Sequence, residues 1–370
     1  MSKSTILCST SAVLAALLAA PAAAQLKYEN GSGGSTTIYG QFNPAYLSFD
    51  DGVSSTSELA DNTNSNSRVG LWIRQPFGQS TFAFNFETAL GLRPSSGISQ
   101  TFTPKGVNWQ RTSIRKVDFS LKTPAAGTFY FGQGSMATDG VAEVDLSGTT
   151  LVTYVSVPDT AGAMRFRTSA GVLSGNTIGG SFSDFDGARR GRIRYDTPSL
   201  SGFTLSASYG EEILVQNSNL DTADIALRYS GEVGDIRMKG AIGYARTDPG
   251  TGIKRNDTIG SFSLLHASGF NVTVAAGRRS GGGGDYGYGK LGYQADWFPV
   301  GMTALSVDYY RGSDRTVAGS KSTSMGVGAV QKFDNSNVEA YLGYRTYELS
   351  EPGTSYQDAS SVLFGARWKF

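Results

Sequence analysis

Residues 202–209 read Gly202-Phe203-Thr204-Leu205-Ser206-Ala207-Ser208-Tyr209, with a change of character at every position. One face collects Phe203, Leu205, Ala207 and Tyr209, and the other collects Thr204, Ser206 and Ser208. A period of two is typical of a β-strand, because successive side chains of a strand point to opposite faces. The stretch therefore predicts a strand with one apolar face and one polar face.

The same alternation recurs along the chain, and no segment keeps a helical period. Roughly sixteen strands are expected after residue 35. They should begin near Thr36, Asn66, Ser80, Arg111, Gly127, Arg189, Gly202, Asp221, Asp235, Asn256, Gly269, Tyr286, Met302, Ser322, Ser336 and Ser360.

The connections between these segments alternate in length. Short turns such as 124–126 and 299–300 are separated by longer polar loops such as 50–65, 248–255 and 348–359. Tight turns at one end and long loops at the other are typical of an outer-membrane barrel with periplasmic turns and extracellular loops.

The first 24 residues have the three parts of a secretory signal peptide. Lys3 supplies a positive charge, residues 13–20 are apolar, and Ala22-Ala23-Ala24 forms a cleavage site of small residues. The apolar run is shorter than the about 20 residues that a membrane-spanning helix needs. We expect removal of residues 1–24 and export of residues 25–370. Cys8 is the only cysteine, so the exported chain has no disulfide.

Alternation alone does not distinguish a membrane barrel from a soluble sandwich or a small soluble barrel. Export, an even number of strands too large for one small core, and charged residues on the polar faces favour the membrane. Sixteen strands enclose a lumen too wide for side chains to fill, and a closed barrel satisfies every backbone polar group in lipid. We expect one all-β domain, a 16-stranded antiparallel transmembrane β-barrel with an aqueous channel.

Other function classes find little support. The chain has 32 basic and 31 acidic residues, which does not favour nucleic-acid binding. His266 is the only histidine and precedes a short turn, so the sequence offers no base for a hydrolase at the extracellular loops. We therefore predict that the protein is not an enzyme, with no catalytic residues and no cofactor.

Two motifs were weighed as ligand sites. Residues 287–292 satisfy GxGxxG, but they continue into a strand instead of opening a helix, so they do not predict dinucleotide binding. Residues 184–187 resemble the start of a calcium loop without its glutamate at the twelfth position. No resident metal is predicted, and adventitious calcium binding stays open.

Several short motifs resemble those of the general porin family of Gram-negative outer membranes. They are Ser67-Arg68-Val69-Gly70-Leu71, Phe86-Glu87-Thr88, the stretches 120–133 and 192–203, and the terminal Phe370. Each is weak alone, but their order spans most of the exported chain. The resemblance implies a water-filled channel in outer-membrane lipid, assembled as a homotrimer, through which small hydrophilic solutes and ions diffuse passively.

In that family the third extracellular loop folds inward and narrows the pore between acidic and basic residues. The matching loop here runs from about 134 to 188 and is the longest connection. An irregular loop of this length is usually functional. The resemblance assigns its early carboxylates to the acidic side of the constriction: Asp139, Glu143 and Asp145.

The basic side follows from strand faces. Apolar residues of the second and sixth strands should face lipid, so the alternating basic residues should face the lumen: Arg68, Arg74, Arg190, Arg192 and Arg194. The resemblance places Arg68 and Arg190 at the constriction. On the fourth strand it selects Arg115, whereas strict alternation turns Lys116 inward unless a bulge intervenes. Facing carboxylates across water, such arginines would create a transverse field.

Specificity stays open at this point. Gln133 stands where the family has arginine, and no Pro-Glu-Phe-Gly-Gly follows the acidic cluster, so the resemblance does not define the detailed shape of the constriction. Trp72, Tyr130 and Tyr341 are expected in the lumen and would suit a solute-specific channel for a sugar, an amino acid or an anion. A plugged barrel acting in adhesion is a third interpretation.

The chain ends on Arg367-Trp368-Lys369-Phe370. Alternation places Trp368 and Phe370 on the lipid face at the periplasmic boundary, where aromatic residues are enriched. In the porin family a terminal phenylalanine with this spacing resembles the signal read by the barrel-assembly machinery, which is the partner that the resemblance implies.

Overall fold

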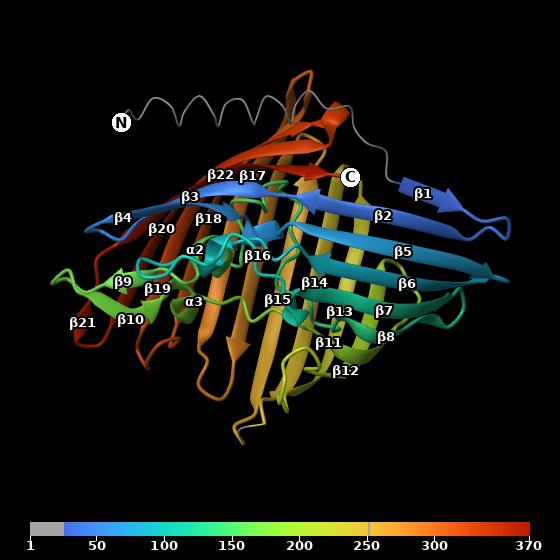
Figure 1. The fold of residues 1–370 in the computed structure, drawn as a ribbon, viewed down its shortest axis with the longest axis horizontal. Helices are drawn as coiled ribbons and strands as arrows, with labels where there is room; N and C mark the ends of the chain where they lie inside the picture. Colours follow the sequence, from blue (N-terminus) through green and yellow to red (C-terminus); the bar gives the residue numbers. More distant parts are fainter. Residues whose placement is uncertain (1–25, 251) are drawn as a thin grey trace.

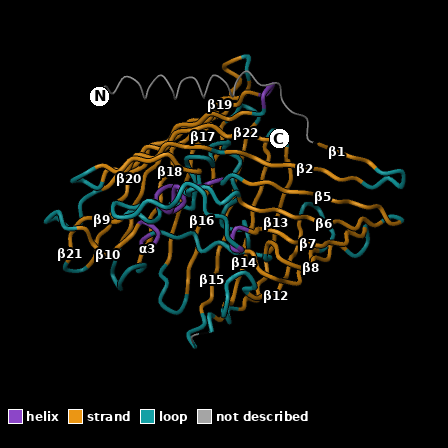
Figure 2. Tube along the Cα trace, in the orientation of Figure 1, coloured by secondary structure: helices purple, strands orange, loops and turns teal. Residues whose placement is uncertain are grey.

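The computed structural model describes residues 26–250 and 252–370, so the expected signal peptide, with Lys3 and Cys8, lies outside the described residues. The strands form a closed antiparallel barrel of sixteen wall strands, as predicted (Figure 1). Helix is confined to a few short turns among strands and loops (Figure 2). None of the helices in the described part of the chain has the length and apolar character that a membrane span requires.

Two of the wall strands are each interrupted once, so they are given as pairs of segments. In chain order the wall consists of β2 (Ser35–Phe42) with β3 (Pro44–Asp50), β4 (Ser55–Asp61) with β5 (Arg68–Phe77), β6 (Ser80–Ala89), β7 (Ile114–Thr123), β8 (Gly127–Ser135), β11 (Arg189–Asp196), β12 (Phe203–Glu211), β13 (Asp221–Val233), β14 (Ile236–Asp248), β15 (Arg255–His266), β16 (Phe270–Arg279), β17 (Asp285–Phe298), β18 (Gly301–Ser313), β19 (Lys321–Phe333), β20 (Val338–Glu351) and β22 (Ala359–Lys369). Short segments β1 (Leu26–Glu29) and β21 (Thr354–Ser355) pair with β2 and β20.

The last strand closes the barrel on the first. β22 pairs with β3 over residues 360–365 and with β2 at Lys369 and Trp368. Phe370 then exchanges two backbone hydrogen bonds with Gly40, at 2.9 and 3.1 Å. A Cβ added to Gly40 would lie 2.6 Å from the Phe370 ring, so Gly40 leaves the space that this ring fills. The prediction that the C-terminus forms the closing strand is confirmed.

The apolar faces of most wall strands point outward, whereas β3 turns Leu47 and Phe49 inward into the buried cluster with the inner loop. On β12, Phe203, Leu205 and Tyr209 are 46%, 43% and 51% exposed, whereas Ser206 is 1% exposed. A soluble sandwich would bury the apolar side chains and expose the serines. An apolar exterior with a polar interior is the arrangement that lipid outside and water inside require.

One predicted loop is partly strand. Residues 50–65 were expected to be irregular, but 55–61 form β4, which pairs with β3 from Ser55–Asp50 to Asp61–Pro44. The apolar period that would have revealed this strand is weak, because Ser55 and Ser57 occupy its outer face. Ser57 instead bonds across the strands to Ser48, Oγ to Oγ, at 2.9 Å. Similarly, residues 348–351 continue β20.

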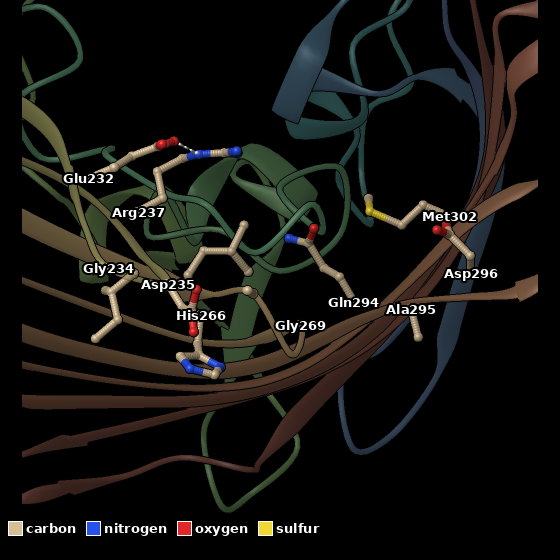
Figure 3. A pocket seen from close by; sticks show the side chains of 13 residues that line it. Glu232, Gly234, Asp235, Arg237, His266, Gly269, Gln294, Ala295, Asp296 and Met302 are labelled. Atoms are coloured by element: carbon tan, nitrogen blue, oxygen red, sulfur yellow. Dashed lines mark hydrogen bonds and ion pairs between the residues drawn. The ribbon is translucent and has the colours of Figure 1, made fainter.

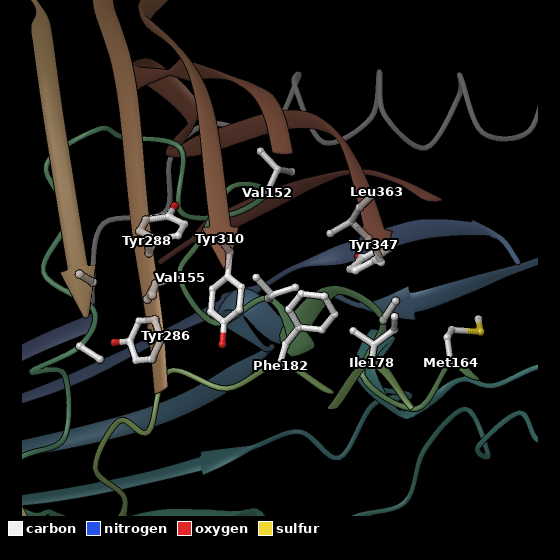
Figure 4. Close-up of a cluster of buried hydrophobic side chains, with 14 of the residues drawn as sticks. Val152, Val155, Met164, Ile178, Phe182, Tyr286, Tyr288, Tyr310, Tyr347 and Leu363 are labelled. Carbon is white, nitrogen blue, oxygen red and sulfur yellow. The ribbon is translucent and has the colours of Figure 1, made fainter. Parts of the chain in front are cut away.

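Residues 136–188, hereafter the inner loop, pack against the inner face of the wall. The inner loop contains β9 (Arg165–Arg167), β10 (Leu173–Thr177), α2 (Pro158–Ala161) and α3 (Ile178–Ser181). Figure 4 shows Phe182 of this loop beside Tyr310 and Tyr347 of the wall, with ring centroids 5.3 and 6.0 Å apart. Tyr309 next to Tyr310 is 47% exposed on the outer face, so Tyr310 points inward. The inner loop is therefore enclosed by the barrel.

Candidate pore constriction

A polar cavity of about 500 Å³ lies between the inner loop and the wall. The wall contributes three arginines, and the inner loop contributes five carboxylates: Arg68, Arg115 and Arg189 against Asp139, Glu143, Asp159, Asp184 and Asp186. Residues 63–66, between β4 and β5, also line the cavity, as do Thr150, Tyr154, Ser156 and Gly187 of the inner loop. The structure thus brings together four of the sequence-predicted residues and adds four charged residues that were not predicted.

The basic wall is built around one shared carboxylate. Glu87 on β6 lies 2.6 Å from Arg115 Nε and 3.8 Å from Arg68 Nε, and it accepts a 2.9 Å hydrogen bond from the Tyr39 hydroxyl. The Arg68 and Arg115 side chains are 23% and 22% exposed. Since one carboxylate serves two guanidinium groups, this part of the wall keeps a net positive charge toward the cavity.

A β-bulge in the fourth wall strand, β7, explains the directions of its two neighbouring basic side chains. Glu87 pairs with Lys116 and Thr88 pairs with Ile114, so Arg115 has no direct partner on β6. Lys116 shares the inner face with Glu87, because directly opposite residues of an antiparallel pair point to the same side. Arg115 reaches the same carboxylate through the bulge. Both Arg115 and Lys116 therefore face inward, and the choice between them that alternation posed does not arise.

On β11 the arginine that lines the cavity is Arg189, not Arg190. Arg189 Nη2 lies 3.5 Å from Asp139 Oδ2, whereas Arg190 is paired with Glu212 at 2.9 Å. Arg189 is the first residue of β11, where the chain leaves the inner loop, so its side chain turns toward that loop. Strand alternation could not reveal this, because it assigns faces only within a regular strand.

The other two arginines of β11 hold the wall and the start of the inner loop. Arg192 makes two hydrogen bonds with Asp118, at 2.9 and 2.8 Å, and its side chain is 1% exposed. Arg194 pairs with Asp196 at 2.8 Å and donates a 2.9 Å hydrogen bond to the Met136 carbonyl. The predicted inward direction of both side chains agrees with these partners, but neither lines the cavity.

Arg74 lies well away from the cavity. It is six residues from Arg68 on the same strand, about 20 Å at the rise of a strand, and it pairs with Ser35 near the end of the barrel that carries the short turns. Its guanidinium lies 4.3 Å from the centre of the Trp72 ring. The sequence identified its face, but the face of a strand does not report height along the barrel.

Asp145 is likewise not part of the cavity. Its carboxylate lies 2.7 Å from Lys290 Nζ on β17, and the two side chains are 4% and 0% exposed. Asp139 and Glu143, six and two residues earlier, do line the cavity. Spacing along an irregular loop does not fix side-chain direction, which is why the three carboxylates could not be separated from sequence.

Four of the loop carboxylates that line the cavity share a crowded environment. Burial raises the pKa of Glu143 and Asp186 well above the ordinary range, and neighbouring carboxylates add to the effect, Asp186 foremost for Glu143 and Asp184 foremost for Asp186. Burial also raises the pKa of Asp184, and it raises the pKa of Asp159 to about 8 with a contribution from Asp184. Asp159 is therefore largely protonated at neutral pH.

The turn that presents Asp184 and Asp186 is held by cation–π contacts. Phe185 between them has a left-handed backbone, with φ of 55°, and its ring lies 4.8 and 5.1 Å from the guanidinium carbons of Arg279 and Arg315. The pair of aspartates was visible in the sequence, but only as a faint calcium motif. Within residues 26–250 and 252–370, no group of three or more Asp, Glu, His or Cys residues is arranged to hold a metal ion.

The expected lumen aromatics do not form an open track. Tyr341 is 5% exposed, and its hydroxyl donates a 2.7 Å hydrogen bond to Asn43. Tyr130 lies beneath the two guanidinium groups of Arg192 and Arg194, each 5.4 Å from the ring centre, and Trp72 lies beneath Arg74. Tyr341 is thus buried and offers no surface to solutes.

A second cavity, of about 410 Å³, opens toward the short turns (Figure 3). Glu232 and Arg237 form a 2.9 Å ion pair at its edge, and His266 lines it, with Nδ1 2.7 Å from the Ser268 hydroxyl. Gln294 also lines it and donates a hydrogen bond to the Leu146 carbonyl of the inner loop. This cavity therefore reaches the side of the inner loop that faces the short turns.

Comparison with solved structures identifies the same architecture. The anion-selective porin of Comamonas acidovorans matches with a TM-score of 0.61 and 16% identity, covering 91% of this chain and 100% of that one. OprB of Pseudomonas putida matches with a TM-score of 0.62 and 10% identity, covering 90% and 94%. Salmonella typhi OmpF, solved with daunomycin, matches with a TM-score of 0.58 and 14% identity, covering 93% and 100%. At these identities the likeness shows the fold alone.

The sequence itself supplies the family. No curated protein matches the chain, but the profile of the Gram-negative porin family matches residues 10–352. This match covers most of the chain, including every wall strand except β22, the inner loop and the charged cavity. The chain belongs to the Gram-negative porin family and is an outer-membrane β-barrel channel for passive diffusion of solutes.

Proposed function

We propose that this porin is a general diffusion channel for small hydrophilic solutes and ions, sorted by size and by the field across the cavity. The carrying observation is the cavity itself, where three arginines of the wall face five carboxylates of the inner loop. A field between fixed charges orients dipolar solutes and makes passage of apolar ones less favourable. The burial of Tyr341 supports a general channel over one with an aromatic track.

A second candidate is a solute-specific channel for anions. Arg68 and Arg115 share one carboxylate, and burial raises the pKa of loop carboxylates including Asp159. Protonation of such carboxylates lowers the negative charge of the cavity, which favours anions. The structurally similar Comamonas acidovorans protein is an anion-selective porin.

The remaining features of the proposal concern assembly and processing. We propose that residues 1–24 are removed as a signal peptide, that Trp368 and Phe370 serve as the signal for the barrel-assembly machinery, and that the protein is a homotrimer without enzymatic activity. A trimer form is named for the similar OmpT of Vibrio cholerae. The terminal hydrogen bonds of Phe370 to Gly40 support a role for this residue in closing the barrel.

Planar-bilayer recording tests these alternatives. A general channel gives stepwise, linear conductance that does not saturate with solute, in groups of three steps if the trimer is correct. Block by a sugar, amino acid or anion at micromolar concentration would favour the specific channel. A folded protein without conductance would contradict both proposals and leave adhesion as the remaining interpretation.

A further inference from the structure

The barrel wall holds one lysine that points only at the inner loop. Lys290 on β17 is 2% exposed. Its ammonium donates to Asp145 Oδ2 at 2.7 Å, to Ser147 Oγ at 3.2 Å, to Thr149 Oγ1 at 3.4 Å and to the Thr153 carbonyl at 2.5 Å. All four acceptors belong to residues 145–153 of the inner loop. A buried ammonium with its acceptors drawn from one loop ties that loop to the wall.

Hydroxyl groups of the wall hold the neighbouring backbone. The Val144 and Leu146 amides donate to Ser261 and Ser263 Oγ, each at 3.0 Å. Ser306 Oγ lies 2.7 Å from Thr149 Oγ1 and 2.6 Å from Thr153 Oγ1. These contacts join neutral groups, which contribute less than a charge-assisted hydrogen bond. Lys290 and Asp145 are the charged pair among them.

Two glycines of the wall form a socket for the same stretch. A Cβ added to Gly343 would lie 2.6 Å from Val152 Cβ, and one added to Gly328 would lie 3.5 Å from that atom. Val152 is 4% exposed, so it fills the socket. The wall therefore accepts this stretch in one position, with Lys290 as its ionic contact and the socket as its steric contact.

We propose that Lys290 is the positioning residue of the constriction, which holds residues 145–153 on the wall and thereby fixes how far the inner loop narrows the pore. Tyr154 and Glu143 flank this stretch and line the cavity, so movement of the stretch changes the aperture. Without the ammonium, the Asp145 carboxylate is left buried without its counter-ion. Because an unpaired buried charge is unfavourable, the stretch leaves the wall and Asp145 reaches water. The inference rests on the proposed channel function only for its conductance readout.

The first test compares Lys290→Met and Asp145→Asn with Lys239→Met, a change at an exposed lysine on β14 that makes none of these contacts. The variants Lys290→Met and Asp145→Asn, hereafter the clamp variants, should both show at least about ten-fold more frequent conductance fluctuations than wild type and the control. Hydrogen exchange of residues 145–153 should accelerate by a similar factor, with wall strands unchanged. If Lys290→Met does not assemble, Asp145→Asn, which lies on the loop, carries the test alone.

A covalent tether supplies the rescue. The exported chain is expected to lack cysteine, and the 3.5 Å between the Gly328 and Val152 β-carbon positions suits a disulfide. Val152→Cys with Gly328→Cys, placed in the Lys290→Met background, should restore quiet conductance when oxidised and lose it on reduction. Wild-type fluctuations and wild-type exchange in both folded clamp variants would overturn the proposal. A silent wild-type channel would contradict the proposed function, while the exchange measurement would still decide the role of Lys290.

Discussion

The wall of the barrel and the inner loop are held by different kinds of contact. Every residue of β13, from Asp221 to Val233, has a backbone partner on β14, so a side chain in the wall owes its direction to its place in a ladder. The inner loop has its own short ladder of β9 and β10 and a few backbone hydrogen bonds to the barrel, such as the one from the Ser169 amide to the Ser355 carbonyl. Side chains such as Ser261 and Lys290 hold much of the rest. Changes at the contacts that hold the wall together should therefore affect assembly, and changes in the inner loop or at the wall residues that face it should affect conduction.

Deletion of Phe370 should have the largest effect, because it removes two backbone hydrogen bonds from the seam between β22 and β2. An open seam leaves unpaired backbone groups in lipid, each at a cost of several kcal/mol. We expect most of the protein to fail to form the barrel, measured as the fraction with heat-modifiable mobility in SDS gels.

Phe298→Ser is the matched control for that deletion. Phe298 is also an exposed aromatic residue, at 55%, near a short turn, but it takes no part in the seam. Equal losses in the two variants would mean that aromatic residues at the boundary matter and that closure at Gly40 does not.

Arg192→Gln separates stability from selectivity among the inward-facing side chains, because Arg192 faces inward without lining the cavity. Removing one partner of a buried ion pair destabilises by about 3–5 kcal/mol. The variant should unfold at lower denaturant concentration, while the reversal potential of any folded channel stays at the wild-type value. A shifted reversal potential would place Arg192 in the ion path.

The double variant Arg68→Gln with Arg115→Gln should, in contrast to Arg192→Gln, change the reversal potential. Both side chains contact Glu87 and reach the cavity, so their loss leaves the acidic side dominant. We expect the reversal potential in a salt gradient to move toward the cation value, by on the order of 10 mV. Arg237→Gln, at the edge of the second cavity, serves as the control and should produce a smaller shift.

The loop carboxylates make selectivity depend on pH. Since the pKa of Asp159 is raised to about 8, this group is neutral below that pH and gains a negative charge above it. Cation preference should therefore rise between pH 7 and pH 9, and Asp159→Asn should remove part of the rise. Selectivity that is constant over this range would contradict the protonation of the cavity near neutral pH.

The loop carboxyl groups also make the stability of the folded protein depend on pH. A carboxyl group with a raised pKa binds its proton more tightly in the folded state, so its contribution is present at low pH and is lost as pH rises through the folded pKa. For Asp159 the loss spans the range from its ordinary pKa to about 8. The protection of inner-loop amides against hydrogen exchange, corrected for the intrinsic pH dependence of the exchange rate, should fall over this range, while that of the wall strands should stay constant.

The sequence predicts the wall because a ladder links position to direction. Strand starts near Gly127, Arg189 and Asp221 agree with the structure, as does the closing strand. The bulge at Arg115 was anticipated as a possibility, since alternation and resemblance disagreed there. The resemblance places Asp145 at the constriction, whereas the structure pairs it with Lys290 away from the cavity. Asp159 was not predicted. The directions of such loop side chains depend on contacts with residues distant in sequence. Arg189 was not predicted to line the cavity, because it is the first residue of β11, where the ladder begins.

Arg74→Gln should give the smallest effect of all. The sequence places Arg74 in the basic ladder, but its guanidinium lies over Trp72, about six residues of strand away from Arg68. Fixed charges act weakly beyond the about 8–10 Å over which salt screens them, so the reversal potential should match wild type in 0.1–0.15 M salt. Repeating the measurement in dilute salt extends the screening length, and a small shift toward cations should then appear. A shift as large as that of Arg68→Gln at ordinary salt would mean that the narrow part of the pore extends to the short-turn end of β5.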